Sequence, residues 1–271
     1  MIDFHCHLNH PSLFLRREFL MDERKKNGGS HLMIPGVNPN YNANTLAILN
    51  HPHATGIRAA LGLHPVWIAE NHDDDLCTVL LTNYVNYYTS TKNSRLCARG
   101  ECGIDLYHPH HSTLTRQQKF FRLQCHIARN LNLPLIIHSR SAFEETREIL
   151  KDFLDLKLYF HCRSYGIKEL ETILQQTDSI WFGITGLITY PKAQELRDCL
   201  KHIPDNALVL ETDAPYLAPQ PIRGKENTPQ AIVYTYDYVA RERGMTKKEL
   251  ISLQKINRNA LYATTPSGRG V

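Results

Sequence analysis

Two histidines one residue apart, His5 and His7, stand near the start of the chain. In an extended strand the side chains at positions i and i+2 point to the same face, so the two imidazoles would lie about 6–7 Å apart. Neutral imidazole is the commonest side-chain ligand for metal ions in proteins. The pair therefore indicates two donors for one metal ion, with two ordinary polar residues at a strand exit as the alternative interpretation.

Further histidines and carboxylates follow short apolar runs along the chain. His138 comes directly after the apolar run 135–137, and His161 comes after the run 158–160 in the same way. The full set of these polar residues is His64, Glu101, His138, His161, Glu211 and Asp213. In a barrel of parallel strands the C-terminal ends of all strands open on one face, where loops build the active site. We therefore expect these side chains to meet there.

Four histidines, one glutamate and one aspartate are enough to hold one or two divalent ions. They are His5, His7, His138, His161, Glu101 and Asp213. Glu101 is placed to bridge two ions, and Asp213 to ligate one of them and to orient or deprotonate the attacking water. Paired ions about 3.5–4 Å apart stabilise the attacking and leaving oxygens of a hydrolytic displacement, and they acidify water enough for a carboxylate to serve as base. The set predicts metal-dependent hydrolysis.

Other charged residues follow these positions in the sequence. Glu211 either orients a ligand histidine or is a structural acid at a strand end. Arg140, Arg163 and the segment from Arg223 to Lys225 are cationic, and a planar guanidinium matches the oxygens of a phosphate bidentately. These cations indicate a phosphate-bearing substrate, and solvated loop charge is the alternative for each of them.

The segments that must position these residues alternate between short apolar runs and longer amphipathic stretches. The predicted strands are 2–4, 31–35, 55–61, 96–98, 134–137, 157–160, 179–182 and 207–210. The predicted helices include 116–130, 142–153, 167–175, 193–199, 229–243 and 247–262. This alternation predicts a single-domain α/β fold, a TIM (β/α)8 barrel. The competing doubly wound sheet usually carries a glycine-rich turn after its first strand, where this chain has His-Cys-His.

The composition of the 271 residues is that of a globular protein, with 42% hydrophobic residues, 21% charged residues and a formal net charge of +4. Such a charge permits a phosphate-bearing substrate without requiring one. No apolar stretch approaches the roughly 18–20 residues of a membrane span, and no signal peptide precedes the first strand. The seven cysteines are odd in number and form no CxxC pair. We therefore expect reduced thiols in a cytoplasmic protein without membrane contact.

Several motifs together resemble the TatD family of metal-dependent deoxyribonucleases, within the wider amidohydrolase-like superfamily. The resemblance covers residues 2–262, which would form the barrel domain and leave 263–271 as a C-terminal tail. The motifs lie at 2–7, 60–65, 100–105, 133–140, 161–162, 210–216 and 223–229. The resemblance implies a TIM barrel that binds two divalent ions through His5, His7, Glu101, His138, His161 and Asp213. It also implies hydrolysis of DNA, typically as a 3′–5′ exonuclease.

The resemblance does not make His64 a metal ligand, and we expect this histidine to contact the scissile phosphate. Further substrate contacts are expected from Arg140 and from a later loop that contains Arg223, Lys225 and Asn227. DNA with single-stranded or frayed ends is the expected partner of a monomeric enzyme. The mixed histidine and carboxylate ligands suit Zn²⁺ or Mn²⁺, and Mg²⁺ if waters complete its shell.

Three departures from the family pattern leave the substrate open. They are the segment Arg163-Ser164-Tyr165-Gly166, Cys102 beside the glutamate, and Thr228 in the later loop. The same barrel could serve an amidohydrolase or deacylase on a small substrate, although the chain has no strand-end lysine suited to a carbamylated bridge between ions. The intact ligand set argues against a third class, a nucleic-acid-binding or scaffold protein with a degenerate site.

Overall fold

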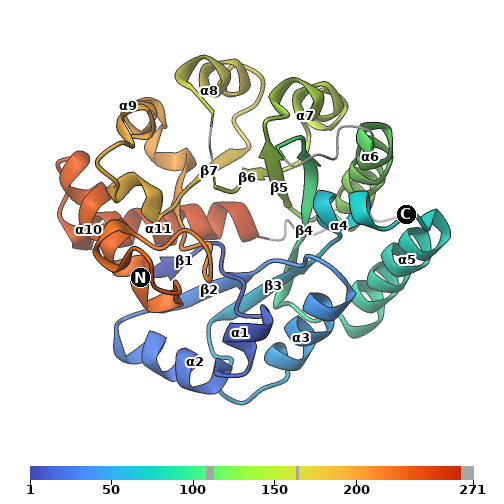
Figure 1. The fold of residues 1–271 in the computed structure, drawn as a ribbon, viewed down its shortest axis with the longest axis horizontal. Coiled ribbons are helices and arrows are strands. Elements are labelled where there is room, and N and C mark those ends of the chain that lie inside the picture. Colours follow the sequence, from blue (N-terminus) through green and yellow to red (C-terminus); the bar gives the residue numbers. More distant parts are fainter. Residues whose placement is uncertain (108–112, 163–164, 264–271) are drawn as a thin grey trace.

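Eight parallel strands form a nearly closed barrel at the centre of the molecule (Figure 1). The computed structural model describes residues 1–107, 113–162 and 165–263. The strands are β1 (Ile2–Asp3), β2 (His31–Ile34), β3 (Ile57–Leu61), β4 (Leu96–Asp105), β5 (Leu135–Arg140), β6 (Leu158–Phe160), β7 (Ile180–Ile184) and β8 (Leu208–Leu210). Each strand pairs with the next along the chain. Backbone hydrogen bonds from Phe4 N to Leu210 O (3.0 Å) and from Asp213 N to His5 O (2.9 Å) join the last strand to the first.

Helices surround the barrel and connect consecutive strands. They are α1 (Pro11–Phe14), α2 (Arg17–Lys26), α3 (Pro39–Leu49), α4 (Pro65–Glu70), α5 (Asp74–Thr91), α6 (Leu114–Leu131), α7 (Phe143–Leu150), α8 (Ile167–Leu174), α9 (Gln194–His202), α10 (Ile232–Glu242) and α11 (Lys247–Tyr262). The predicted single-domain TIM barrel is therefore confirmed. The predicted tail, 263–271, lies outside the described residues except for residue 263.

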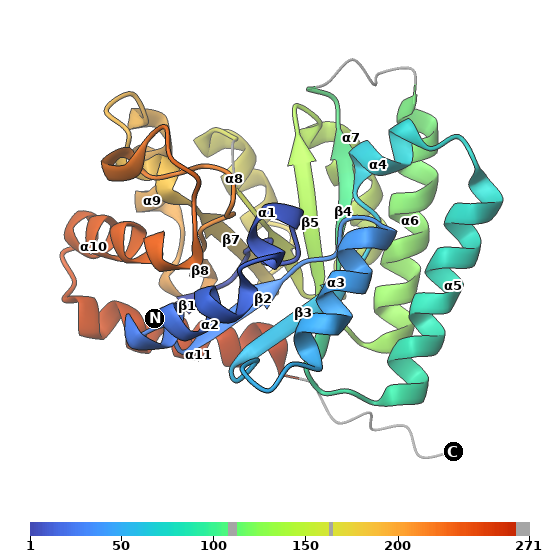
Figure 2. The same cartoon turned by 60° about the horizontal axis from the view of Figure 1, so that its bottom comes forward.

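The last helix, α11, runs across one end of the barrel (Figure 2). It begins with a capping box, in which Thr246 and Glu249 exchange side-chain and backbone hydrogen bonds, so its first turn is fixed. At its other end Leu261 and Tyr262 join the buried cluster inside the barrel, and the Tyr262 ring stacks on Phe4 with centroids 6.1 Å apart. This end of the barrel is therefore filled by apolar side chains, and the opposite end carries the polar residues.

The eight strands are found where they were predicted, but β4 and β5 are longer. The predicted strand 96–98 continues to Asp105, and the predicted strand 134–137 continues to Arg140. The segment after residue 98 has the composition of a loop, because it contains Arg99, Gly100 and Gly103. At Gly103, with a φ of 144°, a side chain would collide with the His138 carbonyl oxygen on the neighbouring strand. The glycine therefore allows β4 and β5 to pair closely, and it places Glu101 and His138 inside strands instead of after them.

The predicted helices that have a clear apolar stripe are found near their predicted positions. In α6 the buried residues include Phe120, Phe121 and Cys125, and the helix ends at Asn132, which has a φ of 52°. The longest unpredicted helix is α5, in which Cys77 and Leu81 are the buried residues. Its tyrosines and threonines gave the sequence a weak helical pattern. Packing against α6 and a buried cluster that includes Phe120 accounts for its position.

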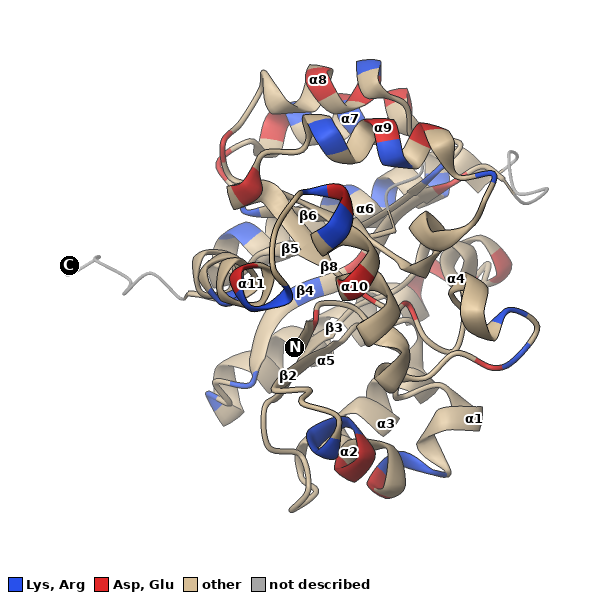
Figure 3. Ribbon diagram, turned by 90° about the vertical axis from the view of Figure 1, so that its left-hand side faces the viewer, with Lys and Arg blue, Asp and Glu red and all other residues tan. Residues whose placement is uncertain are grey.

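The outer helices carry acidic and basic residues side by side, as on α7, α8 and α9 (Figure 3). The view in Figure 3 therefore shows mixed charge and no surface of a single sign. All seven cysteines are free thiols, and six of them are buried. Among the described residues, no helix has the length and apolar character needed to cross a membrane.

Candidate metal centre

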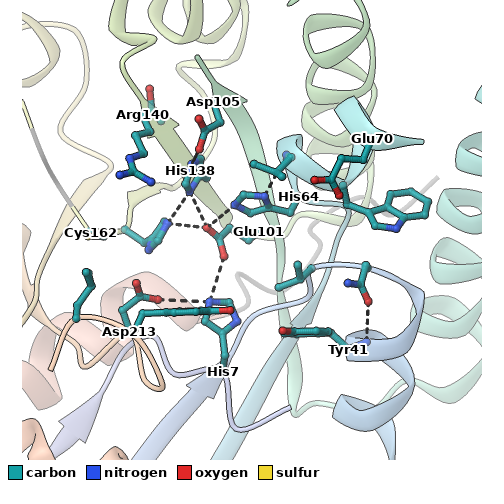
Figure 4. A pocket seen from close by; sticks show the side chains of 18 of the residues that line it. His7, Tyr41, His64, Glu70, Glu101, Asp105, His138, Arg140, Cys162 and Asp213 are labelled. Atoms are coloured by element: carbon teal, nitrogen blue, oxygen red, sulfur yellow. Dashed lines mark hydrogen bonds and ion pairs between the residues drawn. The ribbon is translucent and has the colours of Figure 1, made fainter. Parts of the chain in front are cut away.

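The polar residues predicted from the strand ends meet at one end of the barrel (Figure 4). His5 and His7 follow β1, Glu101 lies in β4, and His138 lies in β5. His161 directly follows β6, and Asp213 comes three residues after β8. The ring of His5 stacks on that of His161 with centroids 4.1 Å apart. The predicted set of six residues is thus assembled from strands that lie far apart in the sequence.

Glu101 lies between two groups of histidines, and each of its carboxylate oxygens faces one group. Oε2 is 3.3 Å from His5 Nε2 and 3.6 Å from His7 Nε2. Oε1 is 3.0 Å from His138 Nδ1 and 2.6 Å from His161 Nε2. The carboxylate therefore has the orientation of a group that can bind one cation through each oxygen.

Asp213 completes the group around His5 and His7. Its Oδ1 is 3.6 Å from His5 Nε2 and 3.4 Å from His7 Nε2. Burial opposes ionisation of this carboxylate, but the close contact with His7 and the charges of the nearby histidines lower the pKa of Asp213 below its usual value. An ionised carboxylate thus lies beside two imidazoles, and its φ of 53° turns the chain into the loop after β8.

The donor atoms fit a bound divalent cation. Glu101 Oε2 and Asp213 Oδ1 are buried and have no hydrogen-bond partner among the described residues. Buried polar atoms in proteins are nearly always partnered, so oxygens that face imidazole nitrogens without a hydrogen bond indicate a ligand between them. Within residues 1–107, 113–162 and 165–263, three groups of donors converge, namely His5, His161 and Asp213; His5, His7 and Glu101; and His64, Glu101 and His138.

The pKa values of His5 and Glu101 favour cation binding, whereas that of His138 means that a cation bound there must displace a proton. Burial lowers the pKa of His5 to about 4, with His161 adding to the effect, so His5 is the neutral imidazole that metals bind. Burial opposes ionisation of Glu101, but the surrounding histidines hold the pKa of this carboxyl well below its usual range. Burial also acts to lower the pKa of His138, but hydrogen bonds with Asp105 and Glu101 outweigh it and raise the pKa to about 9. The surroundings of His138 therefore stabilise positive charge.

Three buried acidic side chains contact the ligands or the backbone beside them. Asp105 Oδ2 lies 2.8 Å from His138 Nε2, which turns Nδ1 of that ring toward Glu101. Glu211 Oε1 accepts a hydrogen bond from the backbone N–H of Cys162 (2.6 Å) and lies 3.9 Å from His161 Nδ1. Asp3 accepts hydrogen bonds from the backbone N–H groups of His5 (3.2 Å) and Thr212 (3.0 Å).

The sequence analysis gave Asp105 no role. The available signal was that Asp105 lies four residues after Glu101 in an extended segment. Residues i and i+4 of a strand share a face, so the two side chains point the same way. The orientation of a ligand histidine by Glu211 stays a prediction, because its closest contact to His161 Nδ1 is long.

His64 lies closer to the ligand set than the sequence analysis expected. Its Nε2 is 3.4 Å from Glu101 Oε1, and its ring lies 4.3 Å from that of His138 between centroids. Its Nδ1 accepts a hydrogen bond from Val66 N (3.2 Å) and caps the first turn of α4. The predicted contact with a scissile phosphate remains a prediction for this residue, which stands at the edge of the candidate centre.

The candidate centre opens into a cavity of about 710 Å³. This volume is within the range of about 300–1,000 Å³ that is typical of small-molecule sites. Arg140 lines the cavity, and its guanidinium carbon lies 3.7 Å from the ring centroid of Tyr107. In Figure 4, Tyr41 and Glu70 lie on the opposite side of the ligand cluster from Arg140. The cavity therefore has a cationic residue on one side of the histidines, and an aromatic and an acidic residue on the other.

The later loop contributes less to the cavity than predicted. Arg223 and Lys225 are exposed and are not among its lining residues, and the Arg223 guanidinium carbon lies 5.2 Å from the ring centroid of Tyr190. Asn227 is fully buried, and its amide donates hydrogen bonds to the carbonyls of Thr212 (2.9 Å) and Tyr216 (2.6 Å). The amide of Asn227 thus holds the loop against the segment that carries Asp213. Substrate contacts by Arg223 and Lys225 stay predictions.

The residues that depart from the family pattern have different surroundings in the structure. Arg163 and Ser164 lie outside the described residues. The hydroxyl of Tyr165 is 2.6 Å from Ser139 Oγ, so this side chain braces the segment after His138. Cys102 is buried behind Glu101, where its thiol packs against the Ile136 carbonyl.

Comparisons with known proteins agree with this centre. Residues 2–263 match the model of the family described as TatD related DNase. The uncharacterized metal-dependent hydrolase YabD of Bacillus subtilis is 28% identical over 264 residues, which is 97% of this chain and 98% of the relative. The metal-dependent hydrolase YcfH of Escherichia coli is 35% identical over 168 residues, or 61% of this chain and 62% of that protein.

Two further relatives bear on the fold and on the chemistry. The crystal structure of YJJV, a TatD homolog from Escherichia coli, superposes with a TM-score of 0.86 at 26% identity and covers 98% of both chains. A human protein named 3′-5′ RNA nuclease TATDN2 is 29% identical over 183 residues, which is 66% of this chain and 24% of that protein. The full-length family match, together with the assembled ligand residues, identifies this chain as a member of the TatD related DNase family of metal-dependent hydrolases.

Proposed function

We propose that the protein is a phosphodiesterase that uses two divalent ions to remove nucleotides from the 3′ ends of DNA, preferring single-stranded or frayed ends. The observation that carries this proposal is the orientation of Glu101, whose two carboxylate oxygens face two separate groups of histidines. One ion would be held by His5, His7, Asp213 and Glu101 Oε2. The second would be held by His138, His161 and Glu101 Oε1, with His64 nearby.

The ions would supply Lewis acidity, which lowers the pKa of a water molecule toward neutrality and neutralises charge on the phosphate oxygens. Asp213 would orient that water and accept its proton at a carboxylate oxygen, and the lowered pKa of Asp213 means only that this carboxylate is ionised at neutral pH. The water oxygen would bond to phosphorus, the bond from phosphorus to the 3′ oxygen of the preceding nucleotide would break, and that oxygen would take up a proton from solvent and leave as a hydroxyl.

The cationic side of the cavity would bind the phosphate. Arg140 lines the cavity, and no ion pair of its guanidinium with a carboxylate occurs among the described residues, so it can bind phosphate oxygens bidentately. His64 would contact the same phosphate through Nε2. Asp105 and the backbone contact of Glu211 would keep His138 and His161 from rotating as the substrate enters.

The name of the human relative, 3′-5′ RNA nuclease TATDN2, makes RNA the second substrate to be compared. The ion also needs to be identified, and the mixed nitrogen and oxygen donors suit Zn²⁺, Mn²⁺ or Mg²⁺. Both points can be resolved in one series of assays.

The test is to incubate the purified protein with Mg²⁺, Mn²⁺ or Zn²⁺ and with single-stranded DNA, duplex DNA or RNA of one sequence, beside an EDTA control. A 5′ label would give a ladder that shortens from the 3′ end, and a 3′ label would be released as a mononucleotide. Metal analysis should find two equivalents of ion per chain. If no ion supports cleavage of any of these substrates, the proposed function is wrong.

A further inference from the structure

Two aromatic residues occupy equivalent positions in neighbouring helices at the cavity. Tyr41 is the third residue of α3 and Trp67 is the third residue of α4, and each helix begins with a proline after a side-chain cap. The caps are Asn38 and His64. A hydrogen bond from His64 N to Val37 O (2.8 Å) joins the two helix starts. The two rings are therefore delivered to the same side of the cavity by one connected piece of backbone.

The positions of both rings are constrained by packing. Trp67 packs against a buried cluster that includes Leu63 and Phe120, and it also lines the cavity. The ring of Tyr41 meets those of His7 and His10 edge-on, with centroids 6.2 Å and 5.7 Å apart. Burial and a hydrogen bond with the Tyr216 hydroxyl raise the pKa of Tyr41 above its usual value, so its ring is neutral. A rigid and uncharged aromatic surface thus borders the cavity.

This surface is coupled directly to the candidate metal centre. His64 lies 3.4 Å from Glu101 through Nε2, and through Nδ1 it caps the helix that carries Trp67 three residues later. The distance from the ligands to Trp67 is therefore fixed by one short helix. In Figure 4 Arg140 lies on one side of the ligand cluster and Tyr41 on the other, and Trp67 also lines the cavity, three residues after His64.

We propose that Trp67, with Tyr41 as a second aromatic residue of the cavity lining, is a stacking surface for the base of the nucleotide that is being released. The inference rests on the proposed function, because it places the scissile phosphate at the metal centre. Every base has a π-face, and one base stacked on an aromatic side chain contributes about 1–3 kcal/mol, which is roughly 5- to 150-fold in affinity. The surface would select nucleotides over phosphodiesters that lack a base, without selecting one base over another.

The chain has two tryptophans, which allows a direct binding measurement. Trp181 lies in the buried cluster inside the barrel, so Trp181→Phe leaves Trp67 as the reporter with little loss of packing. In that variant, loaded with Mg²⁺, dAMP or dTMP should quench tryptophan fluorescence saturably. Neither 2-deoxyribose 5-phosphate nor inorganic phosphate should quench it, although both should compete. Quenching by the base-free sugar phosphate equal to that by dAMP would overturn the inference.

Kinetics separate stacking from simple apolar packing. Relative to the wild type, Trp67→Ala and Trp67→Leu should lower kcat/KM for a single-stranded oligonucleotide by about 5- to 150-fold. Both variants should lower kcat/KM less for the same oligonucleotide ending in an abasic residue. Trp67→Phe should retain most of the preference for the intact end. Equal preference for the two ends in the wild type, or retention of the preference in Trp67→Leu, would overturn the inference.

Failure of the inference can be distinguished from failure of the proposed function. If the wild type degrades DNA but Trp67→Ala degrades it equally well, the nuclease assignment stands and the stacking surface does not. If the wild type degrades no nucleic acid but dAMP still quenches Trp67 while the sugar phosphate does not, base binding stands and the nuclease assignment falls.

Discussion

The two ends of the barrel bury side chains of opposite character. At the closed end Leu261 and Tyr262 of α11 join Phe4 in a cluster of apolar and aromatic groups. At the open end Glu101 and Asp213 are buried with oxygens that have no hydrogen-bond partner among the described residues. Burial of apolar groups stabilises the folded chain, whereas a buried carboxylate oxygen without a hydrogen-bond partner costs free energy. Stability and chemistry are therefore concentrated at opposite ends of the barrel, and mutations should separate them.

The largest effect on activity is expected from Glu101→Ala. This change removes the carboxylate that faces both groups of histidines, so hydrolysis should be abolished and the metal content should fall. The free energy of unfolding of the metal-free protein should stay close to that of the wild type. The change removes the cost of burying the carboxylate, and it also removes the stabilising contacts of that carboxylate with the histidines. Turnover, metal analysis and chemical denaturation in EDTA measure the three quantities. Wild-type turnover with normal metal content would contradict the two-ion proposal.

Asp213→Asn should have the next largest effect. The amide keeps the size of the side chain but cannot accept a proton from water, so kcat should fall by about 10²–10⁴, the usual contribution of a general base. Binding of an oligonucleotide, measured by anisotropy in Ca²⁺, should be largely retained. If binding and rate fall in proportion, Asp213 acts as a ligand that organises the centre and does not activate the water.

Leu261→Ala tests the other end of the barrel. Leu261 is fully buried in the cluster that includes Phe4, and truncation of such a leucine typically costs about 2–5 kcal/mol of stability. The midpoint of urea unfolding should fall accordingly, whereas kcat of the folded enzyme at low temperature should change little. The matched comparison is Glu101→Ala, which should show the reverse pattern. A large loss of kcat in folded Leu261→Ala would contradict the separation between the two ends.

The sequence was sufficient to predict the barrel and the six candidate ligands, because apolar runs that end in a histidine or a carboxylate mark strand ends in one chain direction. The sequence was insufficient where contacts between distant residues determine the local structure. The glycines of β4 resembled a loop, and their role in pairing with β5 depends on the close approach of His138. The hydrogen bond between Asp105 and His138 joins residues that are 33 positions apart. Trp67 was not singled out in the sequence, because the cavity beside it depends on the neighbouring connections.

The smallest effect is expected from the loop after β8, where Arg223 and Lys225 are exposed beyond the cavity lining. If these cations contact the phosphates of a longer strand, Arg223→Ser combined with Lys225→Ser should raise KM for an oligonucleotide and flatten its dependence on salt, because fewer bound counterions are released. Hydrolysis of bis-nitrophenyl phosphate, which is too short to reach the loop, should change much less. Arg241→Ser on α10 is the control for a general loss of positive charge. Equal losses on both substrates would place the loop in contact with the reacting phosphate, and no response to either would mean that its charges are only solvated.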